Sequence, residues 1–142
     1  MSLTGPERAA STPPPFVVKS YLDLSNLPEA DGKFVLLSRG RGVHLVLSPV
    51  DRTPYHANIV YQYLQVEGRG TVEAASSSGC RILSGGWEVN GGGYYRLQGW
   101  LHLLSLHGKS TAFGKYRSRL LLPFMDEVCP NLGLEGFTLE LD

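Results

Sequence analysis

The chain has 142 residues, of which 42% are apolar, and its 13 basic side chains balance 13 acidic ones. This length suits one domain with its own core, and the neutral balance predicts no general binding to nucleic acid or membrane surfaces. No run of about 18 apolar residues occurs, so no segment is expected to span a bilayer. Two cysteines, Cys80 and Cys129, are too few for a cysteine-type metal site or a disulfide framework. We therefore expect a cytoplasmic monomer with reduced thiols.

The N-terminal residues differ in composition from the remainder of the chain. Residues 1–15 are rich in Ser, Thr, Ala and Pro, which is typical of a disordered tail. Residues 16–142 are then expected to form the single domain. Within it, residues 21–24 could form a first, edge-like strand, and residues 28–32 have the composition of a turn.

Two apolar runs rich in Val and Leu follow, at residues 33–38 and 43–47. The short Gly- and Arg-containing connection between them predicts a β-hairpin. A helix is then predicted over residues 54–67. Thr53 can cap it, and proline suits its first position, where no N–H is needed. Its apolar residues recur at helical spacing, and Gly68 ends it.

His56 would lie in the first turn of this helix. That end carries partial positive charge and unpaired N–H groups, so an imidazole there should be neutral near pH 7. A neutral imidazole can take a proton or attack an electrophile, and the helix end beside it suits an anion such as phosphate. An exposed first-turn histidine without a catalytic role is the alternative.

The middle of the chain has a strand-like composition. Residues 71–75 predict a third strand, and the Ser- and Gly-rich residues 76–82 predict a loop or an irregular strand. Arg81 is the large charge inside that run, and it is either a surface residue or an anion contact. Residues 82–106 predict a long antiparallel hairpin, with its turn at the glycines of residues 90–93.

Residues 108–114 form a run of small residues between two glycines. They contain Gly-Lys-Ser but lack the preceding glycine of a P-loop, so a nucleotide triphosphatase is excluded. A bend of this kind can point several backbone N–H groups at one anion. Three cations follow, at positions 115, 117 and 119, and they would oppose the dipole of the next helix unless an anion lies nearby.

The second helix is predicted within residues 115–129, and alternating apolar residues predict a last strand at residues 136–141. The expected fold is therefore α+β, sandwich-like, with about six strands in a mixed, mostly antiparallel sheet and two helices.

Four short motifs occur in order along the chain: DGKFVL at residues 31–36, YHANI at 55–59, GCRI at 79–82 and GKSTAFG at 108–114. In sequence and spacing they resemble motifs of the phosphohistidine phosphatase and janus/ocnus family, over roughly residues 20–142. The resemblance implies an α/β fold without a metal or cofactor. It also implies a hydrolase, a protein phosphatase that removes phosphate from phosphohistidine in a protein or peptide substrate.

The same resemblance suggests a role for each candidate site residue. His56 would be the catalytic residue, either as a general base for water or as the nucleophile. The phosphate-binding residues would be Lys33, Ser110, Thr111, Ala112 and Arg81. Positive charge and backbone N–H groups at these positions would neutralise the phosphoryl oxygens.

Two positions depart from the family pattern. Ser48 stands where the family often has an arginine, with Arg52 nearby, and Ser118 stands where it commonly has a histidine. A non-catalytic phosphate- or phosphopeptide-binding module of the janus family is therefore an alternative. A structural protein that pairs through the edge of the predicted hairpin at residues 82–106 is another. Hydrolysis is preferred because His56, Lys33 and Ser110 are present together.

Overall fold

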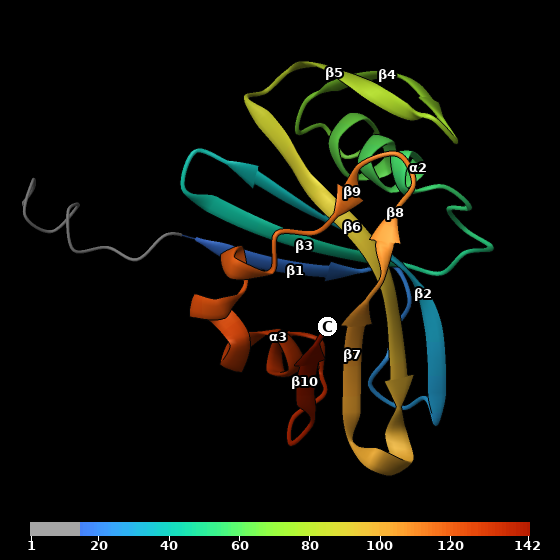
Figure 1. Ribbon diagram of the computed structural model, residues 1–142, viewed down its shortest axis with the longest axis vertical. Helices are drawn as coiled ribbons and strands as arrows, with labels where there is room; N and C mark the ends of the chain where they lie inside the picture. The colour runs from blue at the N-terminus through green and yellow to red at the C-terminus, as the bar shows by residue number, and fades with distance from the viewer. Residues whose placement is uncertain (1–14) are drawn as a thin grey trace, which may run out of the picture.

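The computed structural model describes residues 15–142 (Figure 1). The predicted N-terminal tail lies outside the described residues except for Pro15. The carbonyl oxygen of Pro15 accepts a hydrogen bond from the N–H of Val43 at 3.0 Å. This bond joins the first described residue to the start of the strand that begins at residue 42.

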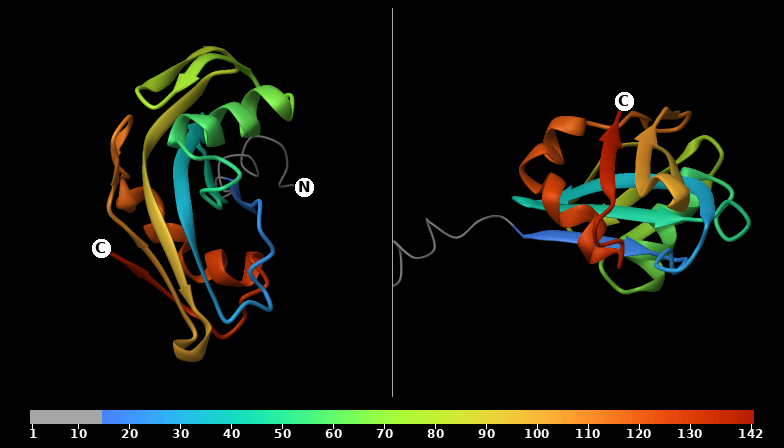
Figure 2. Two further views of the ribbon diagram at one scale, coloured as in Figure 1. Left: turned by 90° about the vertical axis from the view of Figure 1, so that its right-hand side faces the viewer. Right: turned by 90° about the horizontal axis from the view of Figure 1, so that it is seen from below.

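A curled mixed sheet forms the centre of the molecule (Figures 1 and 2). Its six main strands are β1 (Phe16–Ser20), β2 (Glu29–Arg39), β3 (Gly42–Ser48), β6 (Trp87–Gln98), β7 (Leu103–His107) and β10 (Thr138–Leu141). They lie in the order β1-β3-β2-β6-β7-β10. The β1–β3 and β7–β10 pairs are parallel and the other pairs are antiparallel.

Shorter elements complete the fold. The small strands are β8 (Lys109–Ser110) and β9 (Gly114–Lys115), which join the main sheet through β6, and β4 (Thr71–Ser76) and β5 (Gly79–Ser84), which form a separate two-stranded sheet. The helical segments are α2 (His56–Val60), the π-helix η1 (Tyr61–Val66), α3 (Met125–Asn131) and the 3₁₀ turns η2 (Gly99–Leu101), η3 (Ser118–Leu120) and η4 (Leu122–Phe124). The α+β fold predicted from the sequence is confirmed.

The sheet buries a different core on each face. Phe34 and Leu36 of β2 pack with α3 residues on one face, while Val35 and Leu37 pack with α2 and η1 on the other. This division follows from the two-residue period of a strand, which sends neighbouring side chains to opposite faces. A continuous apolar run such as residues 34–37 is what a strand covered on both faces requires.

Several predicted boundaries are correct and others are wrong. The hairpin at residues 33–38 and 43–47 is confirmed, but β2 begins earlier, because the predicted turn at residues 28–32 pairs with β6. The first strand is not at residues 21–24; it is β1, which pairs with β3 in parallel. Parallel pairing across an intervening strand cannot be read from local composition.

The first helix begins later than predicted. α2 starts at His56 with Tyr55 at the N-cap, so Thr53 does not cap it. The Thr53 hydroxyl donates instead to the carbonyl of Pro49 at 3.3 Å, and the side-chain oxygen of Asn58 accepts from the N–H of Tyr55 at 3.0 Å. The predicted end is confirmed, because Gly68 has a φ of +75° directly after the helix.

The predicted long hairpin at residues 82–106 is wrong. β6 runs straight through residues 90–93, and β5 pairs with β4 instead. The glycines allow close approach of other groups: a Cβ on Gly92 would lie 2.6 Å from the Phe34 oxygen, and one on Gly93 would lie 2.4 Å from the His107 oxygen. Two residues of β6 oppose Leu36 at this point, which makes a β-bulge. The structural role proposed for that hairpin therefore loses its basis.

The second predicted helix is broken into shorter turns. Pro123 lies at the start of the 3₁₀ turn η4, and α3 begins only at Met125. Pro130 lies inside α3 rather than ending it. The predicted last strand is confirmed as β10, although it begins at Thr138.

The helices are short. Within residues 15–142, no helix is long and apolar enough to cross a membrane.

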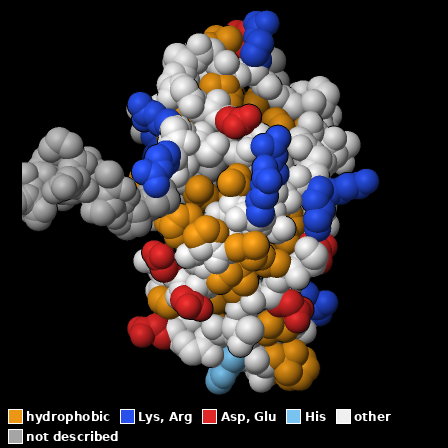
Figure 3. All heavy atoms as spheres, turned by 60° about the vertical axis from the view of Figure 1, so that its left-hand side comes forward, with side chains coloured by type: hydrophobic (Ala, Val, Ile, Leu, Met, Phe, Trp, Pro, Cys, Tyr) orange, Lys and Arg blue, Asp and Glu red, His pale blue; other side chains and the backbone are white. Residues whose placement is uncertain are grey.

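Charged side chains are unevenly distributed over one face of the molecule. On the face drawn in Figure 3, most blue Lys and Arg side chains lie on the upper half and most red Asp and Glu side chains lie on the lower half, around a central group of hydrophobic side chains. Neither sign of charge covers this whole face.

Candidate active site

A cavity of about 200 Å³ lies where α2 begins, beside β2, β6 and the bend between β8 and β9. The residues that line it are Lys33, Tyr55, His56, Ser77, Tyr94, Thr111 and Ala112. Four of the predicted site residues are therefore brought together from three distant parts of the chain. The predicted convergence of the imidazole with the small-residue bend is present in the fold.

His56 is held by the central strand. Its side chain is 5% exposed, and its Nε2 lies 2.8 Å from the carbonyl oxygen of Gly93. A carbonyl oxygen only accepts, so Nε2 carries the proton and donates it. In the neutral ring, Nδ1 then has the free lone pair. The hydrogen bond therefore selects which nitrogen is available for chemistry.

The surroundings of His56 favour its neutral form. Burial lowers the pKa of His56 below its ordinary value of 6.5, and the positive charge of Lys33 lowers it further. The hydrogen bond to the Gly93 carbonyl acts in the opposite direction, because it stabilises the charged ring. Burial is the largest of these effects, so the imidazole is uncharged at neutral pH and can accept a proton.

Gly92 lets His56 and the bend approach each other. A Cβ on Gly92 would lie 2.9 Å from His56 Cδ2 and 3.4 Å from Ser110 Cβ. The two side chains therefore pack over the same small patch of β6. A larger residue at this position would separate the imidazole from the bend.

The bend itself exposes unpaired backbone groups. The Oγ of Ser110 accepts a hydrogen bond from the N–H of Phe113 at 3.1 Å, and Ser110 is 1% exposed. Ser110 thus lies beneath the bend and shapes it. Within residues 15–142, no hydrogen bond engages the N–H of Thr111 or Ala112. Both residues line the cavity, and a free backbone N–H group in such a bend can donate to an anion.

Lys33 supplies the positive charge of the cavity. Its ammonium group donates to the carbonyl of Pro54 and lies 5.9 Å from the ring centroids of both Tyr55 and Tyr94. Cation–π contacts of this kind hold an ammonium group without neutralising it. The charge remains available to a phosphoryl group in the cavity.

Arg81 is not brought to this site. It lies on β5 with an exposed side chain and forms an ion pair with Glu73 of β4. Arg52, near Ser48, stacks over the ring of Tyr21 at 5.0 Å. Neither arginine lines the cavity.

One of the cations after the bend, Lys115, has a local partner. Lys115 forms an ion pair with Asp142 at 2.5 Å, and Asp142 also accepts hydrogen bonds from the Gly108 N–H at 2.8 Å and the Tyr116 hydroxyl at 3.1 Å. Gly108 precedes the bend and the other two residues follow it. Asp142 therefore ties together both ends of the segment that carries Thr111 and Ala112.

The sequence did not single out two of the lining residues. Tyr94 lies opposite Lys33 in the β2–β6 pair, and its ring meets that of His56 edge-on with centroids 5.6 Å apart. Ser77 lies at the tip of the β4–β5 hairpin, beside the bend, where a Cβ on Gly79 would lie 3.8 Å from that of Ala112. Strand register, which local composition does not reveal, places both residues at the site. Tyr55, the N-cap residue of α2, is 46% exposed and also lines the cavity.

The donor set is suited to an anion. It combines one ammonium group, two free N–H groups and a neutral imidazole. Among residues 15–142, no three His, Cys, Asp or Glu side chains are grouped so that they could hold a metal ion.

Comparison with known proteins found no match. No model of a known protein family matches the chain, and no curated protein matches it either.

Proposed function

We propose that this protein is a protein phosphohistidine phosphatase that hydrolyses the P–N bond with His56 and without added metal. The observation that carries the proposal is the hydrogen bond from His56 Nε2 to the Gly93 oxygen at 2.8 Å. It leaves Nδ1 as the basic nitrogen in a cavity that also contains Lys33 and the free N–H groups of the bend. The resemblance of the four sequence motifs supports the same activity.

Binding of the phosphoryl group is the first requirement. The Thr111 and Ala112 N–H groups and the Lys33 ammonium group would donate to the phosphoryl oxygens. Their charges and dipoles would offset the charge that spreads over these oxygens in a loose transition state. Ser110 would contribute indirectly: its hydroxyl oxygen accepts a hydrogen bond from the Phe113 N–H, which holds the bend in shape.

The chemical step can follow two routes. In the first, Nδ1 takes a proton from water, the water oxygen attacks phosphorus, the P–N bond breaks and the leaving imidazole takes up a proton. In the second, Nδ1 itself attacks phosphorus, the P–N bond of the substrate breaks and the leaving imidazole takes up a proton from solvent. Water then attacks the phosphorus of phosphorylated His56, and cleavage of this second P–N bond releases phosphate and the free imidazole of His56. Both routes use the same lone pair, and both release inorganic phosphate.

Phosphate release from a phosphohistidine-containing peptide, with a chelator present, tests the proposal. We expect His56→Ala to lower kcat by about a hundredfold or more, the usual contribution of a positioned base. His102→Asn is the matched control, because His102 is exposed, lines neither that cavity nor a neighbouring one, and has a φ of +49° that asparagine tolerates. Wild-type turnover by His56→Ala at unchanged folding would contradict the assignment.

Rapid quenching at alkaline pH distinguishes the two routes. A phosphorylated His56 found by mass spectrometry supports direct attack. A non-catalytic phosphate-binding module is distinguished by a different result: wild-type protein that binds inorganic phosphate through residues 110–112 but releases none from any phosphoramidate.

A further inference from the structure

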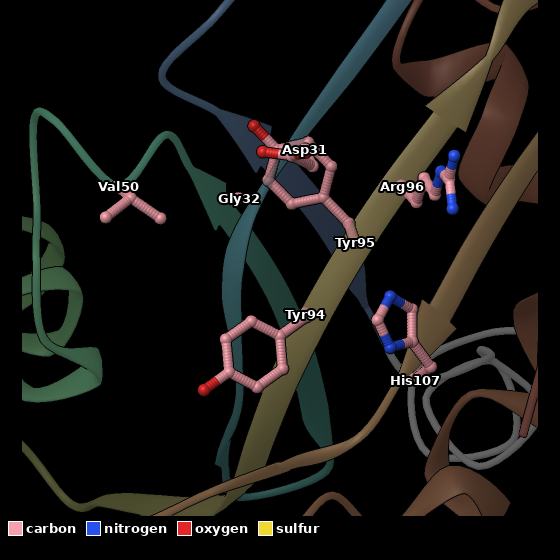
Figure 4. A pocket seen from close by; sticks show the side chains of 7 residues that line it. All are labelled: Asp31, Gly32, Val50, Tyr94, Tyr95, Arg96 and His107. Carbon is pink, nitrogen blue, oxygen red and sulfur yellow. The ribbon is translucent and has the colours of Figure 1, made fainter.

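A second cavity adjoins the candidate active site. It has a volume of about 300 Å³. Its lining residues are Asp31, Gly32, Val50, Tyr94, Tyr95, Arg96 and His107 (Figure 4). Tyr94 also lines the first cavity, so one aromatic ring separates the two.

The register of the sheet explains why the two cavities are neighbours. Lys33, Tyr94 and His107 lie directly opposite one another on β2, β6 and β7. Asp31 and Arg96 form the adjacent pair two residues farther along. Side chains two residues apart on a strand share a face. Asp31 and Arg96 of the second cavity therefore lie on the same face of the sheet as Lys33 and Tyr94.

The first helix covers only part of that face. Val35 and Leu37 of β2 are buried under α2 and η1. Asp31, on the same face, is exposed, and so are Tyr94 and Arg96 on β6. The first cavity thus lies at the end of the covered part, and the second cavity lies on the part that the helix leaves open.

The side chains of the second cavity offer several kinds of contact. The rings of Tyr94 and His107 are stacked, with centroids 6.1 Å apart and an interplanar angle of 26°. Figure 4 shows Asp31 and Arg96 coming from neighbouring strands. Within residues 15–142, neither of these two charged groups forms an ion pair. The Asp31 carboxylate can accept hydrogen bonds from backbone N–H groups, and the Arg96 guanidinium can donate to backbone carbonyls.

The sizes of the two cavities suggest how they divide a substrate. Small-molecule sites usually occupy about 300–1,000 Å³, and the first cavity, at about 200 Å³, is smaller. It suits a phosphoryl group alone. The remainder of a phosphorylated residue has to lie outside the first cavity, and Tyr94 lines both cavities.

We propose that the second cavity binds the polypeptide segment that carries the phosphorylated histidine. This inference rests on the proposed function and adds the position of the leaving part of the substrate. The aromatic pair Tyr94–His107 packs against apolar and aromatic parts of the segment, and Arg96 and Asp31 contact its backbone. The site consequently prefers a phosphorylated polypeptide to a small phosphoramidate.

The test compares two substrates for one set of variants. One substrate is a peptide containing phosphohistidine, and the other is phosphoramidate, which has the P–N bond without a peptide. Arg96→Ala should lower kcat/KM for the peptide about three- to tenfold, as expected for a solvent-accessible charged hydrogen bond, and leave phosphoramidate turnover unchanged. Arg96→Lys should recover part of the loss. Arg41→Ala, an exposed arginine in the turn between β2 and β3, is the matched control.

An equal loss on both substrates, or no loss on the peptide, would overturn the proposal. A binding measurement keeps this conclusion separate from the proposed activity. A peptide carrying a stable phosphonate mimic of phosphohistidine should shift the amide NMR signals of Asp31, Arg96 and His107. Inorganic phosphate should shift those of first-cavity residues, such as Lys33, His56 and Thr111, and leave Asp31 and Arg96 unchanged. Wild-type protein that releases no phosphate contradicts the proposed function; mimic shifts confined to the first cavity contradict the role of the second cavity.

Discussion

His56 and Ser110, far apart in the sequence, pack over the same glycine of the central strand. A Cβ on Gly92 would lie 2.9 Å from His56 Cδ2 and 3.4 Å from Ser110 Cβ. The Phe34 oxygen, only 2.6 Å from the same point, prevents the backbone from making room. The imidazole and the bend between β8 and β9 therefore meet because residue 92 has no side chain.

Gly92→Ala should damage the site more than the fold. We expect a loss of about 1–3 kcal/mol in the free energy of unfolding, typical of overpacking a tight site, and a loss of phosphate release beyond what unfolding explains. Denaturant unfolding and phosphate release at matched folded fractions measure the two effects. Gly40→Ala is the control: Gly40 has a φ of +59° but no atom within 4 Å of its Cβ position, so this variant should lose stability and keep activity.

Lys33→Met should raise the pKa of His56. Burial and the Lys33 charge both lower this pKa below 6.5 in the wild type, and the substitution removes the second cause while keeping a side chain of similar length. Titration of the imidazole signals by NMR measures the change. An unaltered His56 pKa in this variant would show that the lysine charge does not reach the ring.

The depressed pKa also sets the pH dependence of the wild type. A catalytic neutral imidazole predicts that kcat/KM falls on the acidic side with an apparent pKa below 6.5. Stability should decrease in the same direction, because below pH 6.5 the unfolded chain binds a proton that folded His56 resists. An acidic limb centred above 6.5 would point to another group.

Asp142→Ala should loosen the bend from both ends. The variant loses the contacts of this carboxylate with the Gly108 N–H, Lys115 and Tyr116. We expect inorganic phosphate to bind several-fold more weakly, and stability to fall by about 1 kcal/mol or less because the ion pair is half exposed. Calorimetric titration of phosphate measures the first effect, and unchanged affinity would contradict it.

The pKa of Asp142 gives the same contact a pH signature. The bonds from Lys115 and Gly108 lower it to about 2 from an ordinary 3.8. The stabilisation is therefore present above 3.8 and is lost as the pH falls towards 2. Asp142→Ala should lack this loss of stability in acid.

Tyr63→Phe should affect stability without affecting the site. The Tyr63 hydroxyl and His44 Nδ1 form a hydrogen bond of 2.7 Å, and burial lowers the pKa of the His44 ring below its ordinary value. Removing this hydroxyl should cost about 1 kcal/mol in the free energy of unfolding. Tyr61→Phe, at a 40% exposed position, is the control and should cost nothing measurable. A loss of phosphate release in Tyr63→Phe would contradict this separation between the core and the candidate active site.

Local sequence patterns were enough to predict those strands whose apolar pattern is strong. The apolar run of β2, the paired run of β3 and the alternation of β10 reflect burial on strand faces, which composition records directly. The motifs around His56 and Thr111 likewise indicated an anion site. The glycines of β6 misled the prediction, because glycine serves equally in a turn and in a close approach of two backbones.

Which residues share the candidate site depends on the pairing of strands that are distant in the sequence. The register between β2 and β6 places Tyr94 opposite Lys33. The pairing of β4 with β5 places Arg81 opposite Glu73, with which it forms an ion pair. Local residue preferences carry no information on which distant strands pair. Long-range packing fixes the pairing, and through it the chemistry of the cavity.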